Sequence, residues 1–264
     1  MHTVLEHIEE LRKRIVRILV SVGVITGLSF VLSIRQFTFR DIILPLPYPD
    51  LSNNVASQLI DFVRNATLPK YVQLIVTSPA QAFVAQMYAA IFLGVLLSTP
   101  LILYEIASFL SPGLYETEKR VIRNTMVPTT ILFIVGCVFG FVFIVPFSME
   151  FLYGYAVSIG AQTFITLDDL VSFVLLFVLA FGASFELPVI MWVLSTVGLV
   201  NAQFWKNNWR YAFVAITIFG AVITPDGSGI TMWFVALPMM VLYIAGYLSI
   251  RRKSTSSQHS QQSG

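Results

Sequence analysis

Six apolar runs dominate the sequence, and most of them are long enough to cross a lipid bilayer as a helix. A bilayer core needs about 20 apolar residues per helix. The runs cover residues 15–34, 80–104, 125–149, 170–197, 211–224 and 231–250. Hydrophobic residues make up 56% of the chain and charged residues only 11%, a composition that a soluble domain cannot bury. The sequence therefore predicts an all-α, polytopic membrane protein with six transmembrane helices.

The last two predicted helices are short, and the chain ends in a polar tail. Residues 211–224 span only about 21 Å as a helix, less than the roughly 30 Å hydrocarbon layer. A helix of that length must thin the bilayer or end inside it. The segment 254–264 is rich in Ser and Gln, which predicts disorder. Residues 1–253 form a single predicted transmembrane domain.

Lys and Arg residues gather on one side of the predicted membrane. Twelve of the 16 lie before the first run, between the second and third, between the fourth and fifth, or after the sixth. The other four are Arg35, Arg40, Arg64 and Lys70. Because basic residues that flank spans stay in the cytoplasm, both termini are predicted to be cytoplasmic. A cleaved signal peptide is not expected, since the first run is too long and lacks a small-residue exit.

One loop, residues 35–79, is longer than the others and is predicted to lie outside the cell. Within it, Val55, Leu59, Phe62 and Val63 recur at helical spacing. This pattern predicts a short amphipathic helix on the outer membrane surface.

The segment before the first span carries acidic residues that a topogenic signal does not need. In a helix, Ile8, Leu11 and Ile15 form one face, whereas the opposite face carries the charged residues Glu6, Glu9, Glu10, Lys13 and Arg17. The simplest interpretation is a solvated helix start, with Glu9–Lys13 and Glu10–Arg14 as ordinary i,i+4 pairs. That interpretation leaves Glu6 unpaired.

A second acidic cluster lies in the predicted cytoplasmic loop between the second and third spans. Glu116 and Glu118 precede a helix, whose positive N-terminal end favours carboxylates. Helix capping is one explanation. Two acidic elements on one membrane face, next to Phe109 and Tyr115, also suit the binding of guanidinium groups, which make strong bidentate bonds to carboxylates.

Four sequence strings resemble the TatC family, the multispanning receptor subunits of the twin-arginine protein translocase. The opening HIEELRKR at residues 7–14 is similar to the family's His-Leu-x-Glu-Leu-Arg-x-Arg. The other strings are STPLILYE at 98–105 with FLSPGLYETEKR at 109–120, AFGASFELP at 180–188, and GAVITPD at 220–226. They occur in the family's order and on the expected sides of the spans.

The resemblance implies a protein without covalent chemistry, catalytic residues, metal or cofactor. It implies that Glu10 and Glu118 contact the paired arginines of a signal peptide on folded cargo, with Phe109 in the same site and Arg12 in support. Transport is then driven by the proton gradient. The implied partners are signal peptides, single-span subunits of the TatA or TatB type, further copies of the chain and the lipid bilayer. The implied location is the cytoplasmic membrane of a prokaryote.

Three acids within or beside the spans have more than one interpretation. Glu186 lies in the fourth span, where an ionisable residue is costly unless paired, which predicts either a functional residue or a polar anchor between helices. The resemblance implies that it contacts a single-span partner. Glu105 is a second intramembrane polar candidate, and it stands where several family members carry Gln. Asp226 is predicted in the outer hairpin, as a turn residue or in transport. Pro188 predicts a local break after Glu186.

Other classes of function fit the sequence less well. A proton-coupled transporter of small solutes would use Glu186, Glu105 and Asp226 as relay groups, but it predicts repeated broken helices, which the sequence lacks. An intramembrane enzyme needs a nucleophile with a base, or metal ligands, and all three histidines lie outside the spans. Nucleic-acid binding does not fit a net charge of +2.

Overall fold

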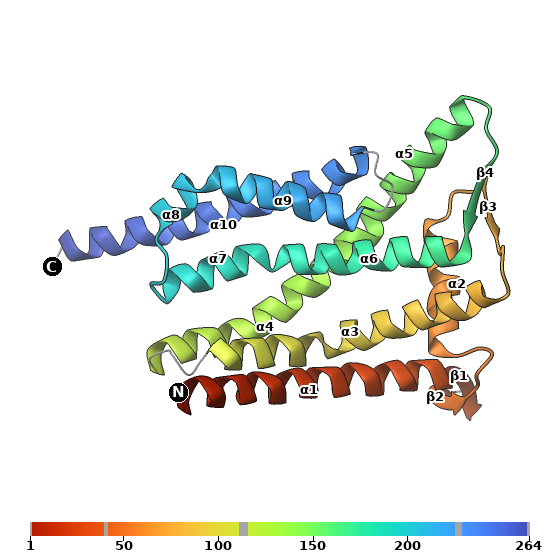
Figure 1. The fold of residues 1–264 in the computed structure, drawn as a ribbon, viewed down its shortest axis with the longest axis horizontal. Coiled ribbons are helices and arrows are strands. Elements are labelled where there is room, and N and C mark those ends of the chain that lie inside the picture. The colour runs from red at the N-terminus through yellow and green to blue at the C-terminus, as the bar shows by residue number, and fades with distance from the viewer. Residues whose placement is uncertain (1, 40–41, 111–115, 225–228, 263–264) are drawn as a thin grey trace. The chain divides into compact units, whose positions relative to one another are not determined.

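The computed structural model is predominantly helical and describes residues 2–39, 42–110, 116–224 and 229–262 (Figure 1). Within this part of the chain, five helical segments are long and apolar enough to cross a membrane: Ile8–Val31, Ala80–Phe109, Lys119–Ser158, Leu167–Thr196 and Ile230–Arg252. Each coincides with a predicted run. The predicted span 211–224 corresponds to a shorter apolar helix, Trp209–Ile223.

The chain divides into two compact units, of which the first comprises residues 1–109 and 145–175. Its elements, labelled in Figure 1, are α1 (His2–Val31), β1 (Leu32–Phe39), β2 (Ile42–Pro49), α2 (Val55–Thr67), β3 (Val72–Ile75), α3 (Ala80–Leu110), α5 (Val145–Ser158), β4 (Thr163–Thr166) and the start of α6 (Leu167–Phe185). Helices α1 and α3 lie side by side and run in opposite directions (Figure 1). Small side chains such as Ala85, Ala89 and Ala90 of α3 are fully buried.

Residues 110–144 and 176–264 form the second unit. It contains α4 (Glu116–Phe139), a π-helical turn over Gly140–Ile144, the end of α6, α7 (Leu187–Thr196), α8 (Ala202–Asn207), α9 (Trp209–Ile223) and α10 (Ile230–Gln262). Helix α10 packs against both α7 and α9. Glycines of this unit allow close approach: a Cβ added to Gly136 would lie 2.6 Å from the carbonyl oxygen of Phe181. At Gly136, the backbones of α4 and α6 therefore approach each other closely, as is common between membrane helices.

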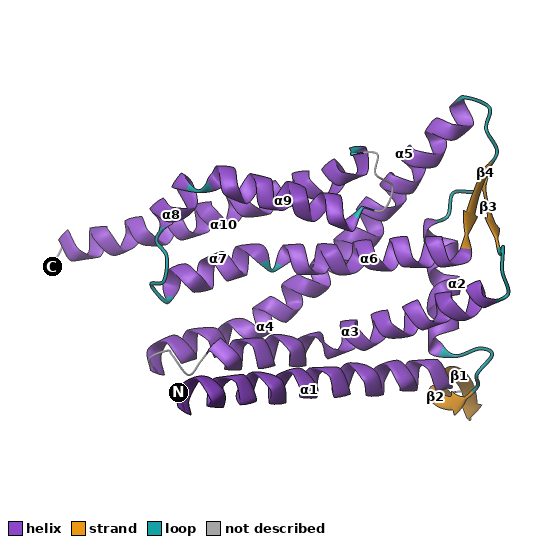
Figure 2. Cartoon of the chain, in the orientation of Figure 1, coloured by secondary structure: helices purple, strands orange, loops and turns teal. Residues whose placement is uncertain are grey.

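The fold is predominantly helical, as predicted, but the connections also contain short strands that the sequence analysis did not predict. Figure 2 shows two small sheets, in which β1 pairs with β2 antiparallel and β3 with β4 parallel. Prolines 45, 47 and 49 occupy alternate positions of β2. Alternate residues direct their N–H groups to the same edge of a strand, so prolines at this spacing fit an edge that donates no ladder bonds. Hydropathy over membrane-length windows does not detect short strands in the connections.

The amphipathic helix predicted in the long loop is present as α2, but its buried face differs from the predicted one. Ala56, Ile60 and Val63 are buried, whereas Phe62 is 58% exposed. Asn54 caps the helix: its Oδ1 accepts a hydrogen bond from the backbone N–H of Ser57 at 2.8 Å, and its Nδ2 donates to the carbonyl of Phe30 at 2.8 Å. The cap ties the start of α2 to the end of α1.

The last helix is longer than predicted. Helix α10 continues to Gln262, so it is not short, and its final turns run through the segment for which the composition predicts disorder. No Gly or Pro lies between Arg251 and Gln262, and Gln, Lys and Arg are good helix formers. Nothing in this stretch interrupts the backbone hydrogen bonds of the preceding apolar turns.

Candidate functional site

The first turns of α1 present three charged residues on one face. Glu10, Arg14 and Arg17 follow at spacings of four and three residues, which places them one above another along the helix. On the exposed side, Glu9 and Lys13 form an ion pair at 3.2 Å. This pair was predicted from the sequence and is confirmed, as is the second predicted i,i+4 pair, between Glu10 and Arg14. The Glu9–Lys13 pair is open to solvent and stabilises the helix little.

Glu105 of α3 accepts two arginines of α1. Its Oε2 lies 2.9 Å from Nη1 of Arg14, and its Oε1 lies 3.0 Å from Nη1 of Arg17. The side chain is only 2% exposed. A buried carboxylate requires such partners, because leaving it unpaired costs several kcal/mol (roughly 3–5).

Arg14 is shared between two carboxylates. Its Nε and Nη2 both donate to Oε1 of Glu10, at 3.1 and 2.5 Å, while Nη1 donates to Glu105. Glu10 is 35% exposed, far more than Glu105. We call Glu10, Arg14, Arg17 and Glu105 the α1–α3 clasp. Its two carboxylates and two guanidinium groups balance in charge.

The clasp lies at one end of a longer seam, the contact surface between α1 and α3. One turn beyond Arg17, the hydroxyls of Ser21 and Ser98 are hydrogen-bonded at 3.0 Å. Further along, Gly94 lies so close to α1 that an added Cβ would be 2.8 Å from the carbonyl oxygen of Val22. At these positions the two helices meet through polar and small residues.

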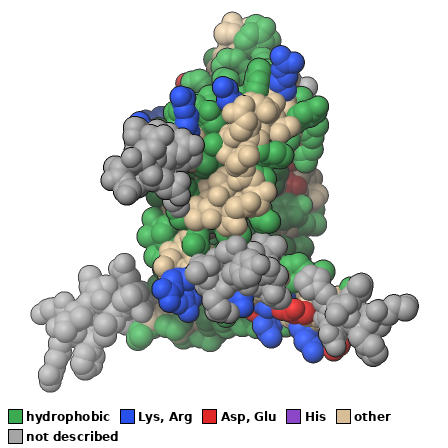
Figure 3. All heavy atoms as spheres, turned by 90° about the vertical axis from the view of Figure 1, so that its left-hand side faces the viewer, with side chains coloured by type: hydrophobic (Ala, Val, Ile, Leu, Met, Phe, Trp, Pro, Cys, Tyr) green, Lys and Arg blue, Asp and Glu red, His purple; other side chains and the backbone are tan. Residues whose placement is uncertain are grey.

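The structure describes the side chains of only some of the other predicted site residues. Arg12 is exposed on α1, and Phe109 is partly buried at the end of α3. Glu118 lies in the first turn of α4, but its side chain lies outside the described residues, as does Asp226 altogether. In Figure 3, acidic and basic side chains gather at the lower edge of the face, where Figure 1 draws the start of α1. The structure thus brings Glu10 into a charged cluster with two arginines.

Glu186 lies between α6 and α7, in the second unit. It is 6% exposed, and within the described part of the chain neither of its carboxylate oxygens has a hydrogen-bond partner. Its N–H donates to the carbonyl of Ala183, and α7 then begins with Pro188 in its first turn. The break predicted at Pro188 is confirmed. An unpaired carboxylate among apolar helices marks a place where a further polar group is needed.

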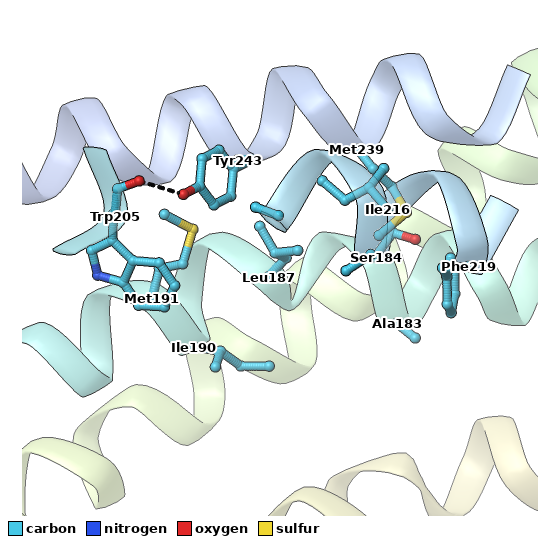
Figure 4. Close-up of a pocket in the computed structure, with 12 residues that line it drawn as sticks. Ala183, Ser184, Leu187, Ile190, Met191, Trp205, Ile216, Phe219, Met239 and Tyr243 are labelled. Atoms are coloured by element: carbon cyan, nitrogen blue, oxygen red, sulfur yellow. Dashed lines mark hydrogen bonds between the residues drawn. The ribbon is translucent and has the colours of Figure 1, made fainter. Parts of the chain in front are cut away.

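The second unit also contains an apolar pocket of about 320 Å³. Its lining includes Ser184 and Leu187, which are close to Glu186 in the sequence. Figure 4 shows Leu187, Met191 and Tyr243 turned into it. Tyr243 donates a hydrogen bond to the carbonyl of Trp205 at 2.7 Å, and the indole N–H of Trp205 donates to Ser195 at 2.9 Å. These bonds fix the wall formed by α8 and α10. The pocket offers almost no polar groups to a ligand.

By their length and composition, the long apolar helices define a polytopic helical membrane protein. The family model described as Sec-independent protein translocase protein (TatC) matches residues 6–238. The chain belongs to the TatC family, whose members are components of a protein translocase and not enzymes.

Relatives from several kinds of organism support this membership. A TatC protein of Cenarchaeum symbiosum is 44% identical over 248 residues, which cover 94% of each chain. A chloroplastic TATC of Arabidopsis thaliana is 30% identical and is matched over 92% of this chain and 65% of its own length. A crystal structure described as the twin arginine translocase receptor TatC superposes with a TM-score of 0.74, at 26% identity, over 92% of this chain and 96% of that one.

Sequence reasoning missed the partners of Glu105. It grouped Arg17 with the charged stripe of α1 and treated Glu105 as an intramembrane polar residue, without joining the two. A signal was available, since Glu105 is the only acid in the run from Ala80 to Leu110 and sits near its end. A lone carboxylate there needs a cation from a neighbouring helix, and only the tertiary structure shows which helix supplies it.

Proposed function

We propose that this chain is the receptor subunit of a twin-arginine translocase and binds the signal peptides of folded cargo at its cytoplasmic face. Glu10 and Glu118 each accept one arginine of the pair. Phe109 packs against the bound peptide, and Arg12 supports the site electrostatically. The chemistry suits the ligand, because a planar carboxylate and a planar guanidinium form two parallel charge-assisted hydrogen bonds.

The observation that carries this proposal is the hydrogen bonding and solvent exposure of the Glu10 carboxylate. Its Oε1 already receives two N–H groups of one guanidinium, that of Arg14. Its Oε2 accepts no hydrogen bond from any residue that the structure describes, and the side chain is 35% exposed. Both N–H groups converge on one oxygen, so Glu10 already accepts a guanidinium group of this chain and keeps its other oxygen for an arginine of the peptide.

The proposal extends to topology and partners. Six spans place both termini in the cytoplasm of a prokaryotic cell, and the proton gradient across the membrane drives transport. Single-span subunits of the TatA or TatB type associate with the chain through Glu186, and several copies assemble in one complex. Asp226 lies in the outer hairpin.

Deleting the gene tests the proposed function directly. A reporter that folds in the cytoplasm is fused to a twin-arginine signal peptide, and its export is measured with and without the gene. We expect export to stop and to return when the full chain is supplied from a plasmid. A second reporter that crosses the membrane unfolded, through another route, controls for general damage. Continued export of the folded reporter without the gene would refute the proposal.

Replacement of Glu186 tests its role in partner association. We expect Glu186→Ala to reduce recovery of a tagged single-span partner by about tenfold, since an interhelical polar contact in a membrane contributes roughly 1–2 kcal/mol. Glu186→Gln should retain part of the association, because an amide can still form hydrogen bonds. Ser148→Ala is a matched control: this hydroxyl is also buried and unpaired among the described residues, but it lies in the first unit. Normal association and export in Glu186→Ala would sink the assignment.

A further inference from the structure

The α1–α3 clasp contains more than an arginine receptor needs. Glu105, Arg14 and Arg17 are not among the residues to which the proposed function assigns the peptide. We propose, on the basis of that function, that Glu105 is a positioning residue of the receptor. It holds Arg14 and Arg17, and so preserves on Glu10 the negative charge that an incoming arginine requires.

The sharing of Arg14 gives the physical reason. Arg14 faces Glu10 with two N–H groups and Glu105 with one. Arg17 is held by Glu105 through Oε1. Without the Glu105 carboxylate, Glu10 would be the only acid of the clasp beside two guanidinium groups. Its charge would already be overcompensated, and a peptide with two further positive charges would meet net repulsion.

Burial decides which carboxylate can change partners. Glu105 is 2% exposed and cannot recover solvation if its arginines leave, so it keeps them when a ligand arrives. Glu10 is more exposed, so it can accept an arginine of the peptide on its other oxygen and loosen its hold on Arg14 at much lower cost. The clasp therefore has a fixed end on α3 and an exchangeable end on α1.

A purely structural role for Glu105 makes a different prediction. Other contacts also join α1 to α3, among them the Ser21–Ser98 hydrogen bond and the close approach at Gly94. If Glu105 only fastened the helices, breaking any of these contacts would affect peptide binding in proportion to the lost stability. If Glu105 instead sets the charge at Glu10, the affinity for the peptide follows the net charge of the clasp.

Three variants of the full chain in lipid nanodiscs separate the two roles. Binding of a fluorescent twin-arginine signal peptide is measured by anisotropy, and thermal unfolding is recorded for each variant. We expect Glu105→Gln to weaken binding by about tenfold, an effect of the size expected for one unbalanced charge near a half-buried site. Arg17→Gln should tighten binding. The double variant Glu105→Gln/Arg17→Gln removes one charge of each sign and should restore most of the affinity.

Two controls test the same charge change and the same interface. Glu9→Gln removes an exposed acid one residue from Glu10 and should change the affinity less than twofold, since its charge is screened and paired with Lys13. Ser21→Ala breaks a seam contact and should lower stability without changing the affinity. The inference is overturned if Glu105→Gln binds normally, or if the double variant binds as weakly as Glu105→Gln. Failure of the wild-type chain to prefer an arginine pair over a glutamine pair would instead refute the proposed function.

Discussion

Glu118→Ala is expected to weaken binding of a twin-arginine signal peptide by about 30- to 150-fold. Removing one partner of a hydrogen-bonded charge pair costs roughly 2–3 kcal/mol when the other charge is left without a substitute. Peptide binding to the purified full-length chain measures the loss, and site-specific cross-linking of the peptide provides a second readout. A peptide with a Lys pair should bind the wild-type chain weakly, because an ammonium group cannot make the bidentate contact.

Glu116→Ala provides a matched control for this variant. Glu116 lies two residues away at the start of α4 and carries the same charge, but the proposed function gives it no role. We expect it to reduce the affinity only slightly. Equal losses in the two variants would mean that the acidic segment attracts the peptide through general electrostatics. Unchanged cross-linking in Glu118→Ala would remove Glu118 from the binding site.

Gly136→Ala is expected to destabilise the second unit by roughly 2–3 kcal/mol, as overpacking a closed interface does. A Cβ at this position would lie 2.6 Å from the carbonyl oxygen of Phe181 and 2.8 Å from Cβ of Phe185. The nearest atom belongs to the backbone of α6, so no side chain can rotate away to make room. Thermal unfolding of the detergent-solubilised chain, followed by circular dichroism, measures the change.

The opposite sign is expected for Gly27→Ala. Gly27 is also inside a helix, but no heavy atom lies within 4 Å of an added Cβ. Replacing glycine by alanine in a helix favours the helix by roughly 0.5–1 kcal/mol when space is available. A similar unfolding temperature for the two variants would show that the α4–α6 contact does not limit stability.

The apolar runs predicted the long helices because bilayer thickness dictates their length whatever surrounds them. The run at 80–104 became α3, and the run at 231–250 lies within α10. The boundaries were less accurate. Helix α1 starts at His2, since charged residues at the end of a span continue a helix without being apolar, and α3 continues through the single charged residue Glu105 to Leu110. Hydropathy alone does not register those turns.

For the candidate site, too, some features follow from the sequence and others only from the tertiary structure. The sequence by itself determined that acids stand beside the first span, that Glu10 and Arg14 lie one turn apart, and that Glu186 is a costly residue within a membrane helix. These inferences follow from helical spacing and from the energetics of charge in lipid, which are local. Only the tertiary structure decided that Glu105, 88 residues beyond Arg17, closes the clasp. That pairing depends on the antiparallel contact of α1 with α3, and no local pattern encodes which two helices meet.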